Sequence, residues 1–264
     1  MLEVIRQNIA AVPTREEKLS KAREFLQVLS LKILFDKGCF EDMAFVGGTA
    51  LRLLHGMRRY SEDLDFSATR KMGFDFERMM RELGMELSKV GLSPEVGPVS
   101  TNVVRACKVK FPSILSELGL SPMASQKLMI KFEADSNPPE GWGDEIRPFM
   151  GAYAFAVRTY DLPSLFASKL HALLFRKYAK GRDYYDLVWY LGKRVEPNIR
   201  LLNNAARQSG YDGEAFTQGN YRTLLARRVE RADFKRLRAD VEAFLEDKSE
   251  LRLFDRKLFL GMMK

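Results

Sequence analysis

The chain has 264 residues, of which 46% are apolar, and its 43 lysines and arginines against 35 acids give a net charge of +8. This length suits one large domain or two small ones with a core, and the charge suits either simple solubility or a polyanionic partner. No apolar run reaches the length of a membrane span and residues 1–13 lack the features of a signal peptide, so we expect a soluble, cytoplasmic protein with no membrane partner. Two cysteines and two histidines form no disulfide framework and no zinc spacing, and they support a Ser/His/Asp triad poorly.

The first half of the chain alternates helical and strand-like patterns. Residues 14–36 start with Thr14 and Glu17 at the spacing of a capping box and continue with an apolar stripe, which predicts a helix. Alternating strand patterns and helical patterns then follow in the order strand, helix, strand, helix at 43–48, 49–57, 63–68 and 75–92. Three further strands are predicted at 102–111, 126–135 and 151–160, with a loop at 137–143.

The second half of the chain is predicted to be helical from Leu162 onward. The helical segments are 162–178, about 182–191, and most of 198–260 with breaks near Gly210 and Gly219. We therefore expect an α/β front half and a helical back half, with the boundary near residue 160.

The segment FVGGTALRLLHGMRRYSEDLDFSA, residues 45–68, places two aspartates one residue apart in a predicted strand. Alternation puts Asp63 and Asp65 on one face with their Cα atoms about 6–7 Å apart, and turns Leu64 and Phe66 toward the core. Two carboxylates at that separation can share one or two Mg²⁺ ions and leave room for phosphate oxygens.

The same segment opens with Gly47-Gly48-Thr49 at a strand-to-helix junction. Glycine lets the backbone approach a bulky anion, the helix N-terminus offers N–H groups to it, and Thr49 adds a hydroxyl. Arg59 and Ser61 can support the loop between the two motifs. A pair of glycines alone is usually a plain turn, and two aspartates one residue apart are usually a solvated strand edge. The two motifs together, with 13 residues between Thr49 and Asp63, indicate a functional site more specifically than either does alone.

This combination resembles the nucleotidyltransferase signature of the polymerase-β-like superfamily, in which a later strand commonly adds a third carboxylate. The strand at 126–135 offers Glu133 and Asp135, both on the face of Lys131. We favour Glu133 because Asp135 abuts the following loop and can cap a turn, and we leave the alternative open.

A second informative stretch, DLPSLFASKLHALLFRKYAKGRDYYDLVWYL, covers residues 161–191. Lys169 lies among apolar residues at helical spacing, so it either extends to water or lines a cleft, and Arg176 follows on the same side. Asp183 and Asp186, three residues apart on the next helix, can converge on one site or balance the lysine. Asp183 can also simply favour the helix N-terminus.

The two stretches together resemble the AbiEii/AbiGii toxin family of nucleotidyltransferases, the toxins of type IV toxin–antitoxin and abortive-infection systems. The resemblance covers roughly residues 20–195. It implies an α+β fold, with a polymerase-β-like core of mixed sheet and flanking helices followed by a helical C-terminal region. The implied domains are residues 1–160, the nucleotidyltransferase domain, and 161–264, a helical domain that completes the active-site cleft.

The resemblance also implies roles for individual residues. The metal, expected to be Mg²⁺, would be bound by Asp63, Asp65 and the candidate Glu133. The nucleoside triphosphate would be bound by Gly47, Gly48, Thr49 and Lys169, and the positions of Ser61 and Arg176 in the sequence add them as further candidates for binding it. Asp183 would be the essential later acid, with Asp186 as its rival. Thr49 stands where many relatives have serine, which keeps the hydroxyl.

The implied reaction is transfer of a nucleoside monophosphate from an NTP to an acceptor, for which a tRNA 3′ end is a candidate. The basic segment 222–238 has seven lysines and arginines against two acids and can bind RNA phosphates; alternatively it is a solvated helix face with Glu230 paired to nearby arginines. A small-molecule acceptor and a catalytically silent nucleotide-binding module are the competing functions. An antitoxin encoded nearby is the implied partner, without a required stable complex.

Overall fold

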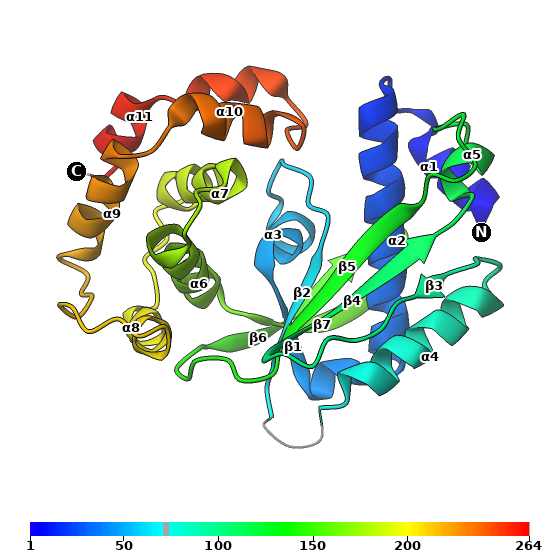
Figure 1. The fold of residues 1–264 in the computed structure, drawn as a ribbon, viewed down its shortest axis with the longest axis horizontal. Helices are drawn as coiled ribbons and strands as arrows, with labels where there is room; N and C mark the ends of the chain where they lie inside the picture. Colours follow the sequence, from blue (N-terminus) through cyan, green and yellow to red (C-terminus); the bar gives the residue numbers. More distant parts are fainter. Residues whose placement is uncertain (71–73, 264) are drawn as a thin grey trace. The chain divides into compact units, whose positions relative to one another are not determined.

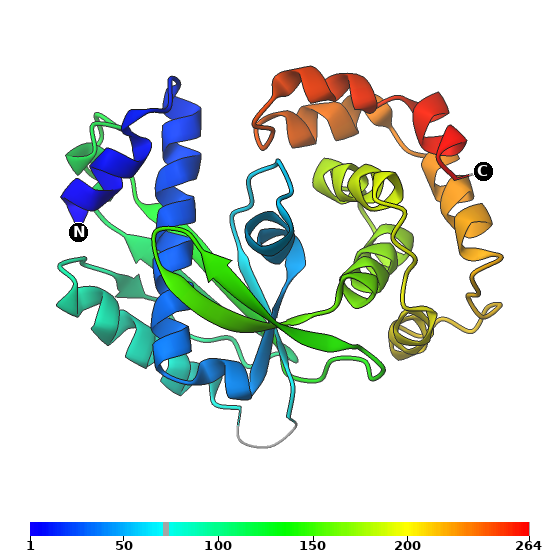
Figure 2. The same cartoon turned by 180° about the vertical axis from the view of Figure 1, so that it is seen from behind.

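The computed structural model describes residues 1–70 and 74–263, which form two compact units (Figures 1 and 2). Unit 1 contains Met1–Gly56, Tyr60–Asn137 and Ile146–Thr159. Unit 2 contains Tyr160–Lys264 and two short segments from earlier in the chain, Met57–Arg59 and Pro138–Glu145. The two short segments matter for the site, because one of them brings Arg59 to the helices of unit 2.

A seven-stranded sheet with the order β3-β4-β5-β2-β1-β7-β6 is the centre of unit 1. Its strands are β1 (Met43–Val46), β2 (Leu64–Ala68), β3 (Glu95–Val96), β4 (Val104–Phe111), β5 (Leu128–Asp135), β6 (Asp144–Met150) and β7 (Ala154–Tyr160). β2 pairs antiparallel with β1 and parallel with β5, while β4 runs antiparallel to β5 and β7 parallel to β1. The sheet is therefore mixed, as expected.

The helices of unit 1 are α1 (Leu2–Ala10), α2 (Arg15–Asp36), α3 (Gly47–His55), α4 (Phe76–Lys89) and the short α5 (Ile114–Glu117), with a 3₁₀ turn at Cys39–Glu41. The predicted capping box starts α2: the backbone N–H of Glu17 donates to Thr14 Oγ1, and the N–H of Thr14 donates to the Glu17 carboxylate. Asp75 caps α4 by accepting from the N–H of Arg78 at 2.9 Å.

One face of this sheet is buried against helices. Figures 1 and 2 show α1, α2 and α4 gathered beside β3, β4 and β5, and the core there includes Phe45, Leu64 and Phe66 from the sheet and Leu26 and Leu29 from α2. Since neighbouring residues in a strand point to opposite faces, the residues between these core positions lie on the other face of the sheet. That face is where the acidic residues of β2 and β5 are found.

Unit 2 is built from α6 (Leu162–Phe175), α7 (Gly181–Gly192), α8 (Ile199–Gln208), α9 (Tyr221–Glu230), α10 (Phe234–Glu242) and α11 (Arg256–Gly261), with a 3₁₀ helix at Lys248–Leu253. α6 packs against α7, α8 and α9, and α7 packs against α10 (Figure 1). Aromatic rings fill the core, and the ring of Phe166 stacks on that of Tyr190 at 4.3 Å. No helix in the described part of the chain is long and apolar enough to cross a membrane.

The structure contains elements that the sequence patterns did not predict: α1, α5, β3 and β6. β6 is an edge strand with alternating exposed and half-buried residues and a proline, Pro148, which an edge position tolerates because its N–H need not pair. Such a strand carries no clear apolar alternation. α3 also begins at Gly47 rather than Thr49, so both glycines lie in its first turn.

Candidate active site

The turn from β1 into α3 lies directly against Asp65. Gly47 has φ of +79°, in the left-handed region that glycine tolerates best, and a Cβ at this position would overlap the Asp65 carboxylate. Val46, the residue before it, is paired with Asp65 across β1 and β2. Glycine is therefore required at position 47 both for the backbone angle and for the space that the carboxylate occupies.

Thr49 connects the first turn of α3 to the residue that precedes β2. Its side chain is fully buried, and its hydroxyl donates to the backbone carbonyl of Asp63 at 2.5 Å. The hydroxyl is thus used within the protein and fixes the backbone of Asp63. The α3 N-terminus has no side-chain cap, since Val46 precedes it, and its first-turn N–H groups carry the partial positive charge of a helix N-terminus.

Glu133 lies next to Asp65 on the same face of the sheet. β5 runs parallel to β2, and the register pairs Glu133 with Asp65 and the buried Phe132 with Leu64. This places another carboxylate beside Asp65, in the strand where a third one was expected.

Lys131 lies beside these carboxylates. Its ammonium pairs with Glu133 at 2.6 Å. This hydrogen bond raises the pKa of Lys131; partial burial opposes the change, and the negative charges of Asp63 and Asp65 add to the increase. The lysine therefore stays charged and neutralises part of an acidic cluster, which we define as Asp63, Asp65 and Glu133.

Asp135, the alternative third carboxylate, has a different environment. Its Oδ1 accepts from the backbone N–H of Asn137 at 2.9 Å, the turn-capping geometry considered from the sequence. Burial raises the pKa of Asp135, and this hydrogen bond opposes the increase. Its register partner on β2 is Ser67, two residues beyond Asp65. Glu133 is therefore better positioned than Asp135 to act with Asp65.

The acidic cluster offers only carboxylate oxygens, the ligands that a hard cation such as Mg²⁺ prefers. In residues 1–70 and 74–263 no three acidic, histidine or cysteine side chains converge as a ready metal site. The chemistry of the donors fits a divalent ion at Asp63 and Asp65, with Glu133 adjacent and held by Lys131. Ser61 lies in the loop before the cluster, and its carbonyl accepts from the Gln27 side chain at 3.2 Å.

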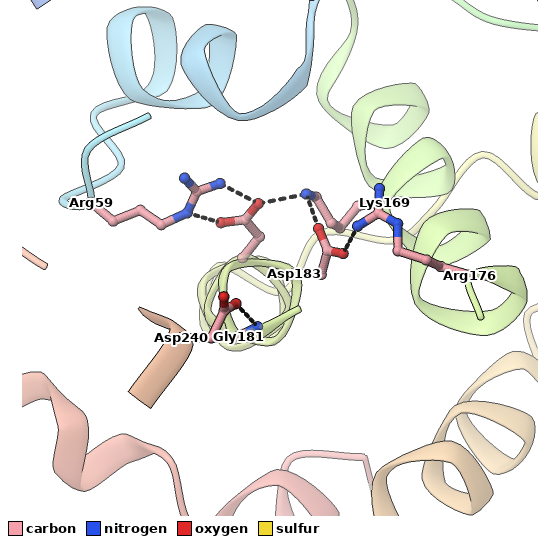
Figure 3. A network of polar contacts seen from close by, with 7 residues as sticks. Arg59, Lys169, Arg176, Gly181, Asp183 and Asp240 are labelled. Atoms are coloured by element: carbon pink, nitrogen blue, oxygen red, sulfur yellow. Dashed lines mark hydrogen bonds and ion pairs between the residues drawn. The ribbon is translucent and has the colours of Figure 1, made fainter. Parts of the chain in front are cut away.

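A second group of charged residues lies within unit 2, and Figure 3 shows it as a continuous chain of ion pairs. Lys169 on α6 pairs with both Asp183 and Asp186 on α7, at 2.8 Å each. Arg59 binds both oxygens of Asp186, at 2.6 and 2.7 Å, and Arg176 binds the other oxygen of Asp183. These five residues, with charges of alternating sign, form what we call the unit 2 ion-pair network.

Most of this network is buried. Asp186 is 0% exposed and Arg59 2%, whereas Arg176 is exposed and forms the solvent end. Burial acts to lower the pKa of Lys169, but the charges of Asp186 and Asp183 outweigh it and the pKa is raised. Burial likewise acts to raise the pKa of Asp183, but Lys169 and Arg176 outweigh it and the pKa is lowered. Both groups therefore remain ionised near neutral pH.

The start of α7 is held by α10. The backbone N–H of Gly181 donates to the Asp240 carboxylate at 2.6 Å (Figure 3), and a Cβ on Gly181 would overlap the carbonyl oxygen of Leu237. This close approach fixes the helix on which Asp183 lies, two residues after the glycine.

The structure thus brings the predicted site residues together in two groups. Gly47, Thr49, Asp63, Asp65 and Glu133 lie together in unit 1, and Lys169, Arg176, Asp183 and Asp186 in unit 2. Two neighbours, Lys131 and Arg59, were named from the sequence but without the ion pairs that they form. Lys131 was visible as a residue on the face of Glu133, but nothing in the sequence marks Arg59 as the partner of a residue 127 positions away.

Comparisons with known proteins identify the family of the chain. Residues 31–259 match the family of nucleotidyl transferase AbiEii toxins of type IV toxin–antitoxin systems. The crystal structure of JHP933 from Helicobacter pylori is similar, with a TM-score of 0.50, 18% sequence identity, and coverage of 92% of this chain and 88% of that one, which supports the fold alone. An inferred nucleotidyltransferase of H. pylori gives a TM-score of 0.49 at 16% identity, with 90% of each chain covered.

A comparison with curated proteins gives no match. The family match nevertheless spans most of the chain and includes both groups of site residues. The chain belongs to the AbiEii nucleotidyltransferase toxin family of type IV toxin–antitoxin systems, and it is a nucleotidyltransferase.

Proposed function

We propose that this protein transfers a nucleoside monophosphate from an NTP to an RNA acceptor, such as the 3′ end of a tRNA, in a Mg²⁺-dependent reaction. The observation that carries the proposal is the approach of the Gly47 turn to Asp65, with Glu133 beside it in register. A helix N-terminus suited to phosphate and carboxylates suited to a divalent ion lie at one point of unit 1.

In this proposal Asp63 and Asp65 bind the metal, and Glu133 is the third carboxylate. When bound, Mg²⁺ polarises the α-phosphate and neutralises charge on the leaving pyrophosphate. The backbone N–H groups of Gly47 and Gly48 hold triphosphate oxygens at the start of α3. Thr49 acts on the reaction through its bond to the Asp63 carbonyl, which keeps that aspartate in place.

The residues of unit 2 have proposed roles of their own. Lys169 and Arg176 bind phosphate oxygens as cations, and Asp183 orients the acceptor hydroxyl and takes its proton. The acceptor oxygen then forms a bond to the α-phosphorus, the bond from that phosphorus to the β-phosphate oxygen breaks, and pyrophosphate leaves. Both aspartates are ion-paired, but Asp186 is fully buried and held by the buried Arg59, which makes it a positioning residue, whereas Asp183 pairs with the exposed Arg176.

The family supports a proposal for the biological setting. We propose that the protein acts as a toxin in abortive infection, as a defence against phage, and that its antitoxin is encoded nearby and needs no stable complex with it. The basic segment 222–238 favours RNA over a small antibiotic-like molecule as the acceptor.

The proposal is tested with Asp65→Asn and a matched control, Asp135→Asn, on the neighbouring strand. Purified proteins are incubated with each labelled NTP, Mg²⁺ and total tRNA, and label in RNA is measured. Loss of one metal carboxylate is expected to slow transfer by at least about a hundredfold, while the turn-capping Asp135 variant keeps transfer within about a few-fold of wild type. Transfer by Asp65→Asn at the wild-type rate would refute the metal assignment.

A further inference from the structure

Two neighbouring cavities in unit 2 combine arginine side chains with aromatic rings. The larger, which we call the arginine pocket, has a volume of about 360 Å³. Its lining includes Phe175, Tyr211, Phe216, Arg227, Arg228 and Arg231. The smaller cavity, of about 210 Å³, shares Arg228 and Arg231 with it and adds Lys177, Tyr178 and Arg236. The shared arginines make the two cavities continuous parts of one basic surface.

The aromatic wall of the arginine pocket is held in a fixed arrangement. The ring of Tyr211 stacks on that of Phe216 at 5.5 Å and meets the edge of Phe175 at 5.2 Å. The backbone N–H of Phe216 donates to Asn203 Oδ1 at 2.8 Å, and the Asn203 amide donates back to the Phe216 carbonyl at 2.9 Å. Flat rings held in this way suit stacking on a nucleobase.

The arginine wall comes from α9 and the residue after it. Arg228 is anchored, because its guanidinium donates to the carbonyls of Leu173 and Arg176 at the end of α6, at 3.2 and 2.7 Å. Arg227 and Arg231 are exposed and form no ion pair within residues 1–70 and 74–263. The pairing of Glu230 with nearby arginines, considered from the sequence, is likewise absent from that part of the chain.

The linings of the two cavities contain one acid, Asp233, against the cations Lys177, Arg227, Arg228, Arg231 and Arg236, so the surface keeps a net positive charge. The Asp233 carboxylate also caps α10 by accepting from the Arg236 N–H at 3.2 Å. Exposed guanidinium groups that lack carboxylate partners and face aromatic rings match a ligand with both a phosphate and a flat base. The carboxylates of an acidic peptide would pair with the arginines, but such a peptide has no flat ring to stack on the aromatic wall.

We propose that the arginine pocket and its smaller neighbour bind a single-stranded segment of the RNA acceptor. A base stacks against Tyr211 and Phe175, Arg227 and Arg231 bind its phosphate, and the next phosphate lies at the smaller cavity near Lys177 and Arg236. The volume of about 360 Å³ lies within the range of small-ligand sites and accommodates one nucleotide. This inference rests on the proposed function, since it assigns a binding site to the same acceptor.

The test compares Arg227→Glu/Arg231→Glu with Arg238→Glu, which changes an exposed arginine of the same basic segment that lines neither cavity. Binding of a fluorescent single-stranded RNA is measured by anisotropy at several salt concentrations. The double variant is expected to bind at least about tenfold more weakly and to lower the salt slope by about 0.7, because both arginines bind the same phosphate and each lost phosphate contact contributes about 0.7. Arg238→Glu is expected to stay within about threefold of wild type.

Tyr211→Ala, which leaves the charge unchanged, tests the ring wall and is expected to weaken binding by about tenfold with an unaltered salt slope. Thermal melting of each variant identifies any that fail to fold. The assignment is overturned if wild type binds no RNA, if the double variant binds as tightly as Arg238→Glu, or if polyglutamate of matched charge displaces the RNA as well as unlabelled RNA does.

Label transfer separates this inference from the proposed function. Asp65→Asn is expected to bind RNA with wild-type affinity while transferring label at least about a hundredfold more slowly, because it removes a metal carboxylate in unit 1 and leaves the arginine pocket in unit 2 unchanged. If wild type binds RNA through the arginine pocket but never transfers label to it, the proposed function fails and the pocket stands. If wild type transfers label and the double variant keeps full RNA affinity, the pocket assignment fails alone.

Discussion

Arg59 provides the sharpest test of how unit 2 is held together. Replacing it with methionine keeps an unbranched stem but removes the guanidinium that binds both oxygens of Asp186 at 2.6 and 2.7 Å. Asp186 is fully buried, so Lys169 would be its remaining charged partner in the network. Removal of one partner from a buried ion pair typically costs about 3–5 kcal/mol, because the other charge is left without compensation.

The neighbouring residue gives a matched control. Arg58 belongs to the same segment of unit 2 but is 62% exposed, and it pairs with Glu250 at 3.6 Å. An exposed pair of this kind contributes about 0–1 kcal/mol. We therefore expect Arg59→Met to lower the free energy of unfolding by about 3–5 kcal/mol and Arg58→Met by less than about 1 kcal/mol.

Urea unfolding followed by tryptophan fluorescence measures this difference directly, since both tryptophans, Trp142 and Trp189, belong to unit 2. The double variant Arg59→Met/Asp186→Asn should lose less than the sum of the single changes, because it leaves no uncompensated charge. If Arg59→Met unfolds within about 1 kcal/mol of Arg58→Met, the buried network does not stabilise unit 2 and the reasoning is wrong.

Three further predictions follow from other contacts. Because the pKa of Asp183 is lower in the folded than in the unfolded protein, its contribution to stability is complete above the unfolded pKa of 3.8 and is lost as the pH falls through the lower folded pKa. Acid unfolding followed by tryptophan fluorescence should show this loss of stability below pH 3.8 in wild type and not in Asp183→Asn. Gly47→Ala should abolish label transfer. Gly56→Ala, at a similar φ of +71° but with open space around it, should lower stability and leave label transfer unchanged; equal transfer by the two variants would contradict the close approach of Gly47 to Asp65. Lys131→Met should tighten Mn²⁺ binding about fivefold, because it frees Glu133 from an ion pair worth about 1 kcal/mol. Calorimetry without substrate measures this affinity, and weaker Mn²⁺ binding by the variant would show that the lysine supports the metal site.

The parts of the fold that could be predicted are those with local signals. The capping box of α2 and the apolar stripe behind it identify that helix, and the alternation of Leu64 and Phe66 with Asp65 identifies β2 and its buried face. The glycine turn was recognised because Gly47 and Gly48 lie between an apolar strand pattern and a helical pattern. The register that sets Glu133 beside Asp65 is not local, and the sequence left Asp135 as an alternative.

Long-range contacts account for most of what could not be predicted. The bond from Thr49 to the Asp63 carbonyl spans 14 positions, and the hydroxyl was expected to face phosphate instead. The pairing of Arg59 with Asp186 depends on a three-residue segment that joins unit 2 although its neighbours on both sides belong to unit 1. No periodicity or composition marks such a segment, because its role arises only from tertiary packing.

The contact between Gly181 and α10 means that the last part of the chain has a structural task beyond its own helices. Since Leu237 and Asp240 determine where α7 begins, they also determine the direction in which Asp183 leaves its helix. A toxin shortened before α10 would keep every residue of both site groups and still lack the support for one of them. Frameshifts or nonsense mutations late in the gene would then inactivate the protein as effectively as the loss of Asp183.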